Sequence, residues 1–388
     1  MEDSAQPNVV QTPTDAIRKK FSWKNVLLGI IIGAILVGIV AITFWYFTRP
    51  KESETSPPNT TKTSTSSASP VTKDETMKLS FLAWKDSSSH EKGEALFIAD
   101  KDGNNKEILQ EFIYKDPKVS YLSWDFSPDN KKIVASSGVI IDIASKKQTP
   151  IPSGRCHNWS PDGKKIIYES SGISIMDSDG TNPKKLITDG GLCAGSNNVY
   201  HWSPNSTKFF YGAQESIYSF NLLTNEKSLV FDSKSQNIYV RQISVARDGS
   251  KIVFLGYGKA KKVEDDVEDV YTVNADGKGL QKLTNFNKYG VASQPIFTPD
   301  GKNIVFSVSN IYNSYSGLNL VNIGTKEIKN LSKDNADSYS PASISKDGEF
   351  ISYTSGASTY GTVVTVNVTN GSITKLGDSS LSGVHWSK

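Results

Sequence analysis

The sequence has few of the side chains that most often carry catalysis, with two cysteines and four histidines in 388 residues. It contains no Gly-x-Ser-x-Gly elbow, no His-Glu-x-x-His motif and no phosphate-binding glycine loop, so three common enzyme sites are missing. An excess of one charge is also lacking, because 43 basic side chains are balanced by 40 acidic ones. A concentrated basic face is typical of nucleic-acid binding. We therefore expect no nucleic-acid partner, no cofactor and no metal site.

One long hydrophobic run stands out, residues 26–47, which read VLLGIIIGAILVGIVAITFWYF. At about 1.5 Å per residue a helix of this length covers roughly 33 Å, enough to cross a hydrocarbon core of about 30 Å. Arg18, Lys19 and Lys20 precede the run, and the positive-inside rule places such a flank in the cytoplasm. The pattern predicts a single-pass anchor in the cell membrane, with residues 1–25 as a cytoplasmic tail and the rest extracytoplasmic.

A cleaved signal peptide is the alternative interpretation of this run. Its apolar region would be shorter, about 7–15 residues, and would end in small residues suited to cleavage. The sequence FWYFTRP at the end of the run offers no such site. Residues 48–77 follow, rich in Ser, Thr, Pro and charge, and this composition predicts a flexible linker.

A short phrase recurs along the remaining chain at a spacing of roughly 40 residues, which is typical of repeat architectures. It reads FSPDNKKIVAS from Phe126, WSPDGKKIIYES from Trp159, WSPNSTKFFYG from Trp202 and FTPDGKNIVFS from Phe297. Proline presets φ for a turn, Asp suits the next position and Gly accepts the left-handed conformation. The β-branched run that follows indicates a strand, so each phrase predicts a hairpin corner.

A second hairpin follows each corner by about ten residues, for instance SIMDSDGTNPKKLIT from Ser174. Two hairpins make four short antiparallel strands, which is one blade of a propeller. The first blade begins at Lys78 without its innermost strand, while the sequence ends on the lone strand GVHWSK. We therefore expect residues 78–388 to form an all-β, seven-bladed β-propeller, closed by pairing the C-terminal strand with the N-terminal blade.

The aromatic-Ser-Pro-Asp-Gly-Lys-Lys-Ile phrase, followed by Ile-x-x-Met-Asp-x-Asp-Gly and Leu-Thr, resembles the WD-like repeat of TolB-type β-propellers. The resemblance covers about Lys78 to Lys388. It implies the propeller fold, and it says little about function, because such families range from binding scaffolds to the propeller domains of peptidases. The turn departs from the pattern at Asn205-Ser206 and Lys346-Asp347.

Longer connections gather on the face opposite the hairpin turns and carry aromatic residues, which suit partner contacts. The predicted binding rim consists of Tyr257, Phe286, Tyr289, Tyr312, Tyr315, Tyr339 and Tyr360. The alternative is that these residues reflect only the abundance of Tyr, Asn and Ser in the chain.

Each innermost strand carries one residue just before the apolar residue that leads into the corner, for instance His201 before Trp202. Alternation along a strand turns this residue away from the packed side, toward the central channel. The predicted channel ring contains Asp125, Asn158, His201, Ser244, Ile296, Ser343 and His385. One residue per blade does not supply the closely set ligands of a metal site, so we expect solvated or hydrogen-bonded roles.

Cys156 and Cys193 lie in connections of neighbouring blades, on the same face. Such a pair can oxidise outside the cytoplasm, and we expect a disulfide, with two buried free thiols as the alternative.

These observations favour a membrane-anchored extracytoplasmic scaffold that binds a protein, a peptide or an envelope glycan. One alternative is a propeller enzyme acting on a glycan or peptide through carboxylates at the channel mouth, such as Asp265, Asp266, Asp269, Asp334 or Asp337. Another alternative is an extracellular sensor module.

Overall fold

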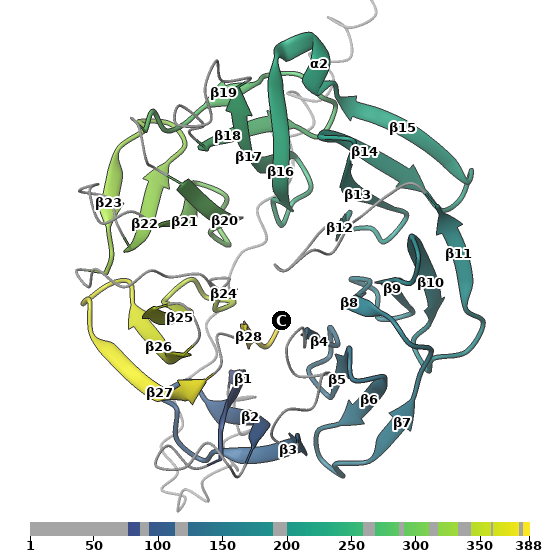
Figure 1. Cartoon of the computed structure of the whole chain (residues 1–388), viewed down its shortest axis with the longest axis vertical. Coiled ribbons are helices and arrows are strands. Elements are labelled where there is room, and N and C mark those ends of the chain that lie inside the picture. Colours follow the sequence, from purple (N-terminus) through teal and green to yellow (C-terminus); the bar gives the residue numbers. More distant parts are fainter. Residues whose placement is uncertain are drawn as a thin grey trace, which may run out of the picture. The chain divides into compact units, whose positions relative to one another are not determined.

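Seven four-stranded antiparallel sheets make up the described part of the chain in a computed structural model. The described residues are 77–85, 93–112, 123–188, 200–258, 268–286, 291–309, 317–332, 343–357, 360–379 and 383–388. The chain divides into two units, Met1–Val71 and Thr72–Lys388, and all described residues belong to the second. In this second unit the sheets stand around a common centre like the blades of a propeller (Figure 1).

Each blade runs from an innermost strand to an outermost strand, in chain order except in blade 1. Blade 1 contains β28 (Val384–Trp386), β1 (Lys78–Trp84), β2 (Glu94–Asp100) and β3 (Glu107–Glu111). Blade 2 contains β4 (Trp124–Phe126), β5 (Lys132–Ala135), β6 (Val139–Asp142) and β7 (Gln148–Pro150). Blade 3 contains β8 (Arg155–Trp159), β9 (Lys165–Glu169), β10 (Ile173–Asp177) and β11 (Lys184–Ile187).

The remaining four blades follow the same plan. Blade 4 contains β12 (Tyr200–Trp202), β13 (Lys208–Ala213), β14 (Ser216–Asn221) and β15 (Glu226–Phe231), and α2 (Ser233–Gln236) follows it. Blade 5 contains β16 (Ile238–Val245), β17 (Lys251–Gly258), β18 (Asp269–Asn274) and β19 (Gln281–Lys282). Blade 6 contains β20 (Val291–Phe297), β21 (Asn303–Ser309), β22 (Gly317–Asn322) and β23 (Ile328–Asn330). Blade 7 contains β24 (Ser343–Ile344), β25 (Phe350–Ala357), β26 (Tyr360–Asn367) and β27 (Ile373–Ser379).

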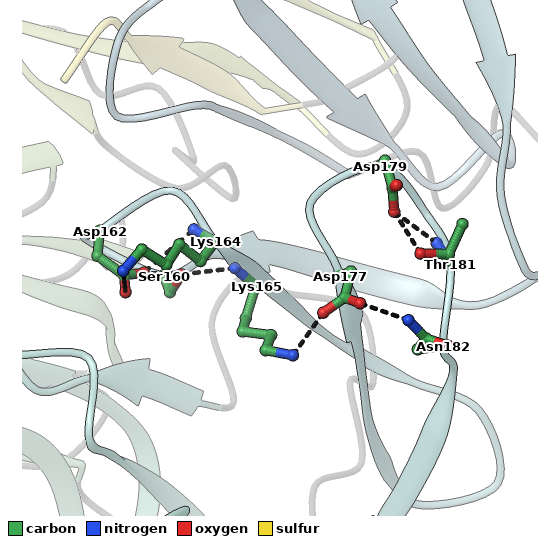
Figure 2. Close-up of polar contacts among 8 residues, drawn as sticks. All are labelled: Ser160, Asp162, Lys164, Lys165, Asp177, Asp179, Thr181 and Asn182. Atoms are coloured by element: carbon green, nitrogen blue, oxygen red, sulfur yellow. Dashed lines mark hydrogen bonds and ion pairs between the residues drawn. The ribbon is translucent and has the colours of Figure 1, made fainter.

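The repeated phrase forms the corner between the two innermost strands of a blade, and blade 3 shows how (Figure 2). The Ser160 hydroxyl donates to the carboxylate of Asp162 at 2.7 Å, and it accepts the backbone N–H of Lys165 at 2.9 Å. The backbone N–H of Lys164 donates to the same carboxylate at 3.1 Å, and Gly163 takes φ +70°. The corner therefore satisfies its own polar groups, which explains why its sequence recurs.

The second hairpin of blade 3 uses its aspartates in the same way (Figure 2). Asp177 accepts a hydrogen bond from the Asn182 side chain at 2.7 Å and pairs with Lys165; these contacts lower the pKa of Asp177. Asp179 accepts from the backbone N–H of Thr181 at 2.9 Å and from its hydroxyl at 2.6 Å. These carboxylates stabilise the turn, which is the usual role of Asp in such positions.

The ring closes where the last strand pairs with the first. In the antiparallel register of β28 and β1, Trp386 is opposite Leu79 and Val384 is opposite Phe81. The backbone N–H of Ser387 donates to the carbonyl of Lys78 at 2.9 Å. The seven-bladed fold with four-stranded antiparallel blades is thus confirmed, and Figure 1 shows the C-terminus at the centre of the ring.

The hydrophobic core lies between neighbouring blades. Trp124 and Phe126 of blade 2 cluster with Leu82 and Leu96 of blade 1, and all are nearly inaccessible to solvent. Burial of each such side chain contributes about 1.5–3 kcal/mol. Because every blade is packed on both faces, the innermost strands are fixed in position and can hold a site at the centre.

The predicted membrane anchor, residues 26–47, and the predicted linker lie outside the described residues. Within the described ranges, no helix has the length and apolar character needed to cross a membrane.

Candidate functional site

A cavity of about 680 Å³ opens at the centre of the propeller, and all seven blades contribute to its wall. The channel-ring positions Asn158, His201, Ser244, Ile296, Ser343 and His385 line it. Asp125 instead lines an adjoining cavity of about 50 Å³, which shares Asn158 and His385 with the larger one. The innermost strands therefore bring the predicted ring positions together around two connected spaces.

A layer that we call the floor, defined as Asp125, Asn158, His201 and His385, borders the two cavities. Its polar contacts centre on the carboxylate of Asp125. Asp125 is buried, and it accepts hydrogen bonds from the Trp159 backbone N–H at 2.9 Å and from the Asn158 side chain at 3.2 Å. The Lys388 ammonium lies 2.6 Å from the same oxygen. Such pairing is what a buried charge requires, so this carboxylate already has its partners.

Two histidines of the floor are uncharged at neutral pH. Burial lowers the pKa of His201 and of His385 to about 4, because removing an imidazolium from water is unfavourable. The His385 ring packs edge-on against Trp124 at 5.1 Å between centroids. Neither imidazole adds charge to the cavity above pH 5, so both act there as polar packing groups.

The mouth of the cavity is defined as the residue at the proline position of the repeat in each blade, and it contains both proline rings and cationic side chains. Its members, in order from blade 2 to blade 7 and then blade 1, are Pro128, Pro161, Pro204, Arg247, Pro299, Lys346 and Lys388. Three consecutive blades thus present proline rings, while blades 5, 7 and 1 present cations. Among the described residues that line this larger cavity, none is acidic. The sequence carries a signal for the mouth, since Arg247 and Lys346 occupy the proline position of the repeat, but the corner turn alone does not reveal that this position faces a cavity.

The predicted aromatic rim is only partly within the described residues. Tyr257 lies at the end of β17, half-buried, and its hydroxyl donates to Glu215 at 2.8 Å; burial and this contact raise the pKa of Tyr257 to about 12. The Tyr257 ring packs against Tyr239 at a tilted angle with 5.3 Å between centroids, and the Arg241 guanidinium lies 5.6 Å from the Tyr257 centroid. This group could contact a partner, because tyrosine and arginine side chains are frequent in interfaces.

Phe286 does not belong to an exposed rim. Its ring is buried and packs against Phe306 at 6.0 Å, and its backbone N–H donates to Asp269 at 2.9 Å. That hydrogen bond turns the connection inward at this point. Tyr360 begins β26, whereas Tyr289, Tyr312, Tyr315 and Tyr339 lie outside the described residues, and their role in a rim stays a prediction.

Cys156 is buried in β8 and is disulfide-bonded. Its backbone N–H donates to the Ser123 hydroxyl at 2.9 Å, which ties the bond to the adjacent blade. Cys193 lies outside the described residues, so the pairing of Cys156 with Cys193 stays a prediction.

Comparison with known proteins supports this fold. Over 108 residues the chain is 27% identical to the Tol-Pal system protein TolB of Francisella tularensis subsp. mediasiatica, a stretch covering 26% of this chain and 23% of that protein. TolB proteins of other Francisella tularensis strains match to the same extent. The match therefore spans about a quarter of the length of these curated relatives. No family model matches the sequence.

Solved structures match this chain at the level of the fold. The crystal structure of TolB from Acinetobacter baumannii is 16% identical, with 80% of this chain and 66% of that chain covered and a TM-score of 0.48. Oligogalacturonate lyase in complex with manganese is 12% identical, with 66% of this chain and 73% of that chain covered and a TM-score of 0.51. The chain is similar in sequence to TolB over the 108 matched residues, and at these identities the likeness to solved structures concerns the fold alone.

Proposed function

We propose that this protein is a membrane-tethered extracytoplasmic scaffold whose central cavity docks a peptide segment of a partner protein. The observation that carries the proposal is the cavity of about 680 Å³ walled by all seven blades. Binding sites are commonly concave, preformed and supported by rigid elements, and a closed propeller provides this at its centre. The matched TolB proteins, which by name belong to a Tol-Pal system, agree with a protein-binding role.

The tether is the second part of the proposal. Residues 26–47 have the length and composition of a membrane span, and basic residues precede them. A tether of this kind, followed by a Ser/Thr/Pro-rich linker, would place the propeller outside the cytoplasm and clear of the bilayer. A disulfide at Cys156 is consistent with an oxidising compartment.

A glycan- or peptide-cleaving enzyme has less support. Glycoside hydrolysis commonly needs two carboxyl groups beside the scissile bond, and none of the described residues in the wall of the larger cavity is acidic. Asp269, which was one candidate, is buried and accepts hydrogen bonds from the Thr284 hydroxyl at 2.7 Å and from the Phe286 backbone. Asp265, Asp266, Asp334 and Asp337 lie outside the described residues.

Site-specific photo-crosslinking of the full chain in the cells that produce it tests the proposal. A photoreactive residue replaces Pro204 at the mouth, and in a matched control it replaces Leu223, which is 76% exposed in the outer hairpin of blade 4. We expect one protein to crosslink at position 204 and not at 223, and mass spectrometry identifies it and the attached segment. Crosslinks at neither position, or the same products at both, would contradict a partner site in the cavity.

A further inference from the structure

At three of the seven positions where the repeat places its proline, the chain has a cation instead. Two of these cations lie in corner turns, and the third, Lys388, follows β28. Arg247, Lys346 and Lys388 stand at this position in blades 5, 7 and 1. A proline that fits its turn stabilises a protein by about 0.4–1 kcal/mol through the unfolded state, so its loss brings no structural benefit. Each replacement puts a positive charge at the mouth of the same cavity.

Two of these cations are available to a ligand. Lys388 is engaged by Asp125 at 2.6 Å, whereas Arg247 and Lys346 form no ion pair with any other described residue and are exposed. The imidazoles of the floor are neutral at physiological pH. The charge presented by the mouth therefore comes from Arg247 and Lys346.

The acidic residues of the same turns point elsewhere. Asp248 follows Arg247, and its carboxylate accepts hydrogen bonds from the backbone N–H of Ser250 at 2.9 Å and from its hydroxyl at 2.7 Å. Asp347 follows Lys346, and its carboxylate accepts from the backbone N–H of Glu349 at 2.9 Å. These carboxylates are held within their turns and do not line the cavity, so the cavity wall is positive although the turns are nearly neutral.

We propose that the mouth selects an acidic peptide segment. In this arrangement a ligand carboxylate lies against Arg247 and Lys346, and an apolar side chain of the ligand packs on the proline arc formed by Pro128, Pro161 and Pro204. The proposal rests on the proposed function and adds the chemical class of the docked segment. Guanidinium and ammonium groups at a concave mouth also attract acidic ligands at a distance, which raises the association rate.

The mouth suits a peptide better than an acidic sugar. Protein sites for sugar rings generally offer an exposed aromatic face, and the indole rings next to this cavity are closed off: Trp159, Trp202 and Trp386 are 3%, 7% and 5% exposed. The apolar surface at the mouth consists of proline rings instead. Proline rings pack well against aliphatic and aromatic side chains, which peptides supply.

Fluorescence anisotropy of the purified full chain tests the selection. The probes are three pools of fluorescein-labelled nonapeptides with two fixed positions, occupied by Asp or Glu, by Asn or Gln, or by Lys. We expect the acidic pool to bind at least about ten-fold more tightly than the other two, as two charge-assisted contacts imply, and to weaken as salt rises. The double variant Arg247→Pro/Lys346→Pro should lose this preference. The variant carries the residue that the repeat itself uses, so the turns are expected to form.

Two matched variants separate site binding from general charge attraction. Lys302→Ala removes one positive charge from the corner turn of blade 6, outside the cavity wall, and should leave the affinity unchanged. Pro299→Lys adds a cation between Arg247 and Lys346 and should strengthen acidic binding several-fold. Equal binding of all pools would overturn the acidic selection and leave the docking function standing. An equal loss of affinity for the acidic pool in Lys302→Ala and in the double variant would also overturn the acidic selection. Failure of every pool, together with no crosslink at position 204, would overturn both proposals.

Discussion

The floor and the mouth of the central cavity are built from the same repeat and differ in how far their polar groups are satisfied. On the floor, Asp125 has three partners within 3.2 Å. At the mouth, Arg247 and Lys346 are exposed and form no ion pair with other described residues. Satisfied buried groups make a fold specific, while unpaired exposed charges add little to stability. The floor is thus a structural element, and the mouth is the part that can recognise a ligand.

Removing the Asp125 carboxylate from the floor should cause the largest loss of stability. Asp125→Ala leaves the Lys388 ammonium and the Trp159 backbone N–H without their buried acceptor. Leaving the hydrogen-bond partners of a buried carboxylate unsatisfied costs about 1–3 kcal/mol, and the Lys388 side chain is 35% exposed, so water partly replaces its contact. We expect the free energy of unfolding, measured by urea denaturation, to fall by about 2–3 kcal/mol. Lys302→Ala, an exposed charge in a comparable turn, should change it by less than about 0.5 kcal/mol. Similar small effects for both variants would show that the floor does not stabilise the ring.

The buried histidines make the stability of the propeller sensitive to acid. His157 is 3% exposed and stacks on Tyr168 at 5.3 Å, and burial lowers its pKa to about 4. An unfolded histidine titrates near 6.5, so the unfolded chain binds the proton first. The contribution of a neutral buried histidine to the free energy of unfolding is therefore fully present above pH 6.5 and is lost as the pH falls toward 4. At pH 5 the loss is about 2 kcal/mol per histidine.

The variant His157→Phe isolates this contribution. Phenylalanine keeps the ring contact and does not titrate, so the loss of stability between pH 7.5 and pH 5 should be about 2 kcal/mol smaller than in the unchanged protein. Denaturation with urea at the two pH values measures it. An unchanged pH dependence would mean that His157 is protonated in the folded protein. Binding of acidic peptides should not follow this titration, because His157 is not among the described residues that line the larger cavity.

Much of the fold could be predicted because the repeat encodes its turns locally. Ser160 and Asp162 form the hydrogen bonds that their own corner turn needs. The same turn pattern in the other copies predicts the number of blades and the pairing of β28 with β1. The contact between Asp125 and Lys388 joins residues 263 positions apart, and no local pattern reports such a contact. Phe286 was expected in a rim because it lies in a long connection. Its burial depends on the bond to Asp269, a neighbouring-strand residue that spacing alone does not identify.

A smaller effect is expected at the link between the closing strand and blade 2. The Asn130 side chain accepts the backbone N–H of Lys388 at 2.7 Å and donates to the Lys388 carbonyl at 2.8 Å. Asn130 takes φ +59°, a conformation that glycine adopts freely. Asn130→Gly therefore removes the two contacts without straining the turn, and we expect a loss of about 1 kcal/mol in urea denaturation. A gain in stability would show that these contacts contribute nothing to closure.

The smallest effect on stability is expected at the mouth, where the comparison with the floor is most direct. Arg247→Pro and Lys346→Pro restore the residue found in four other corners, and neither position has a positive φ. Less freedom in the unfolded chain should raise the free energy of unfolding by about 0.4–1 kcal/mol for each, seen as a higher thermal midpoint. If the cations are instead part of the scaffold, the midpoint falls. A protein that becomes more stable while losing its preference for acidic peptides would show that these two positions are kept for binding at a small cost in stability.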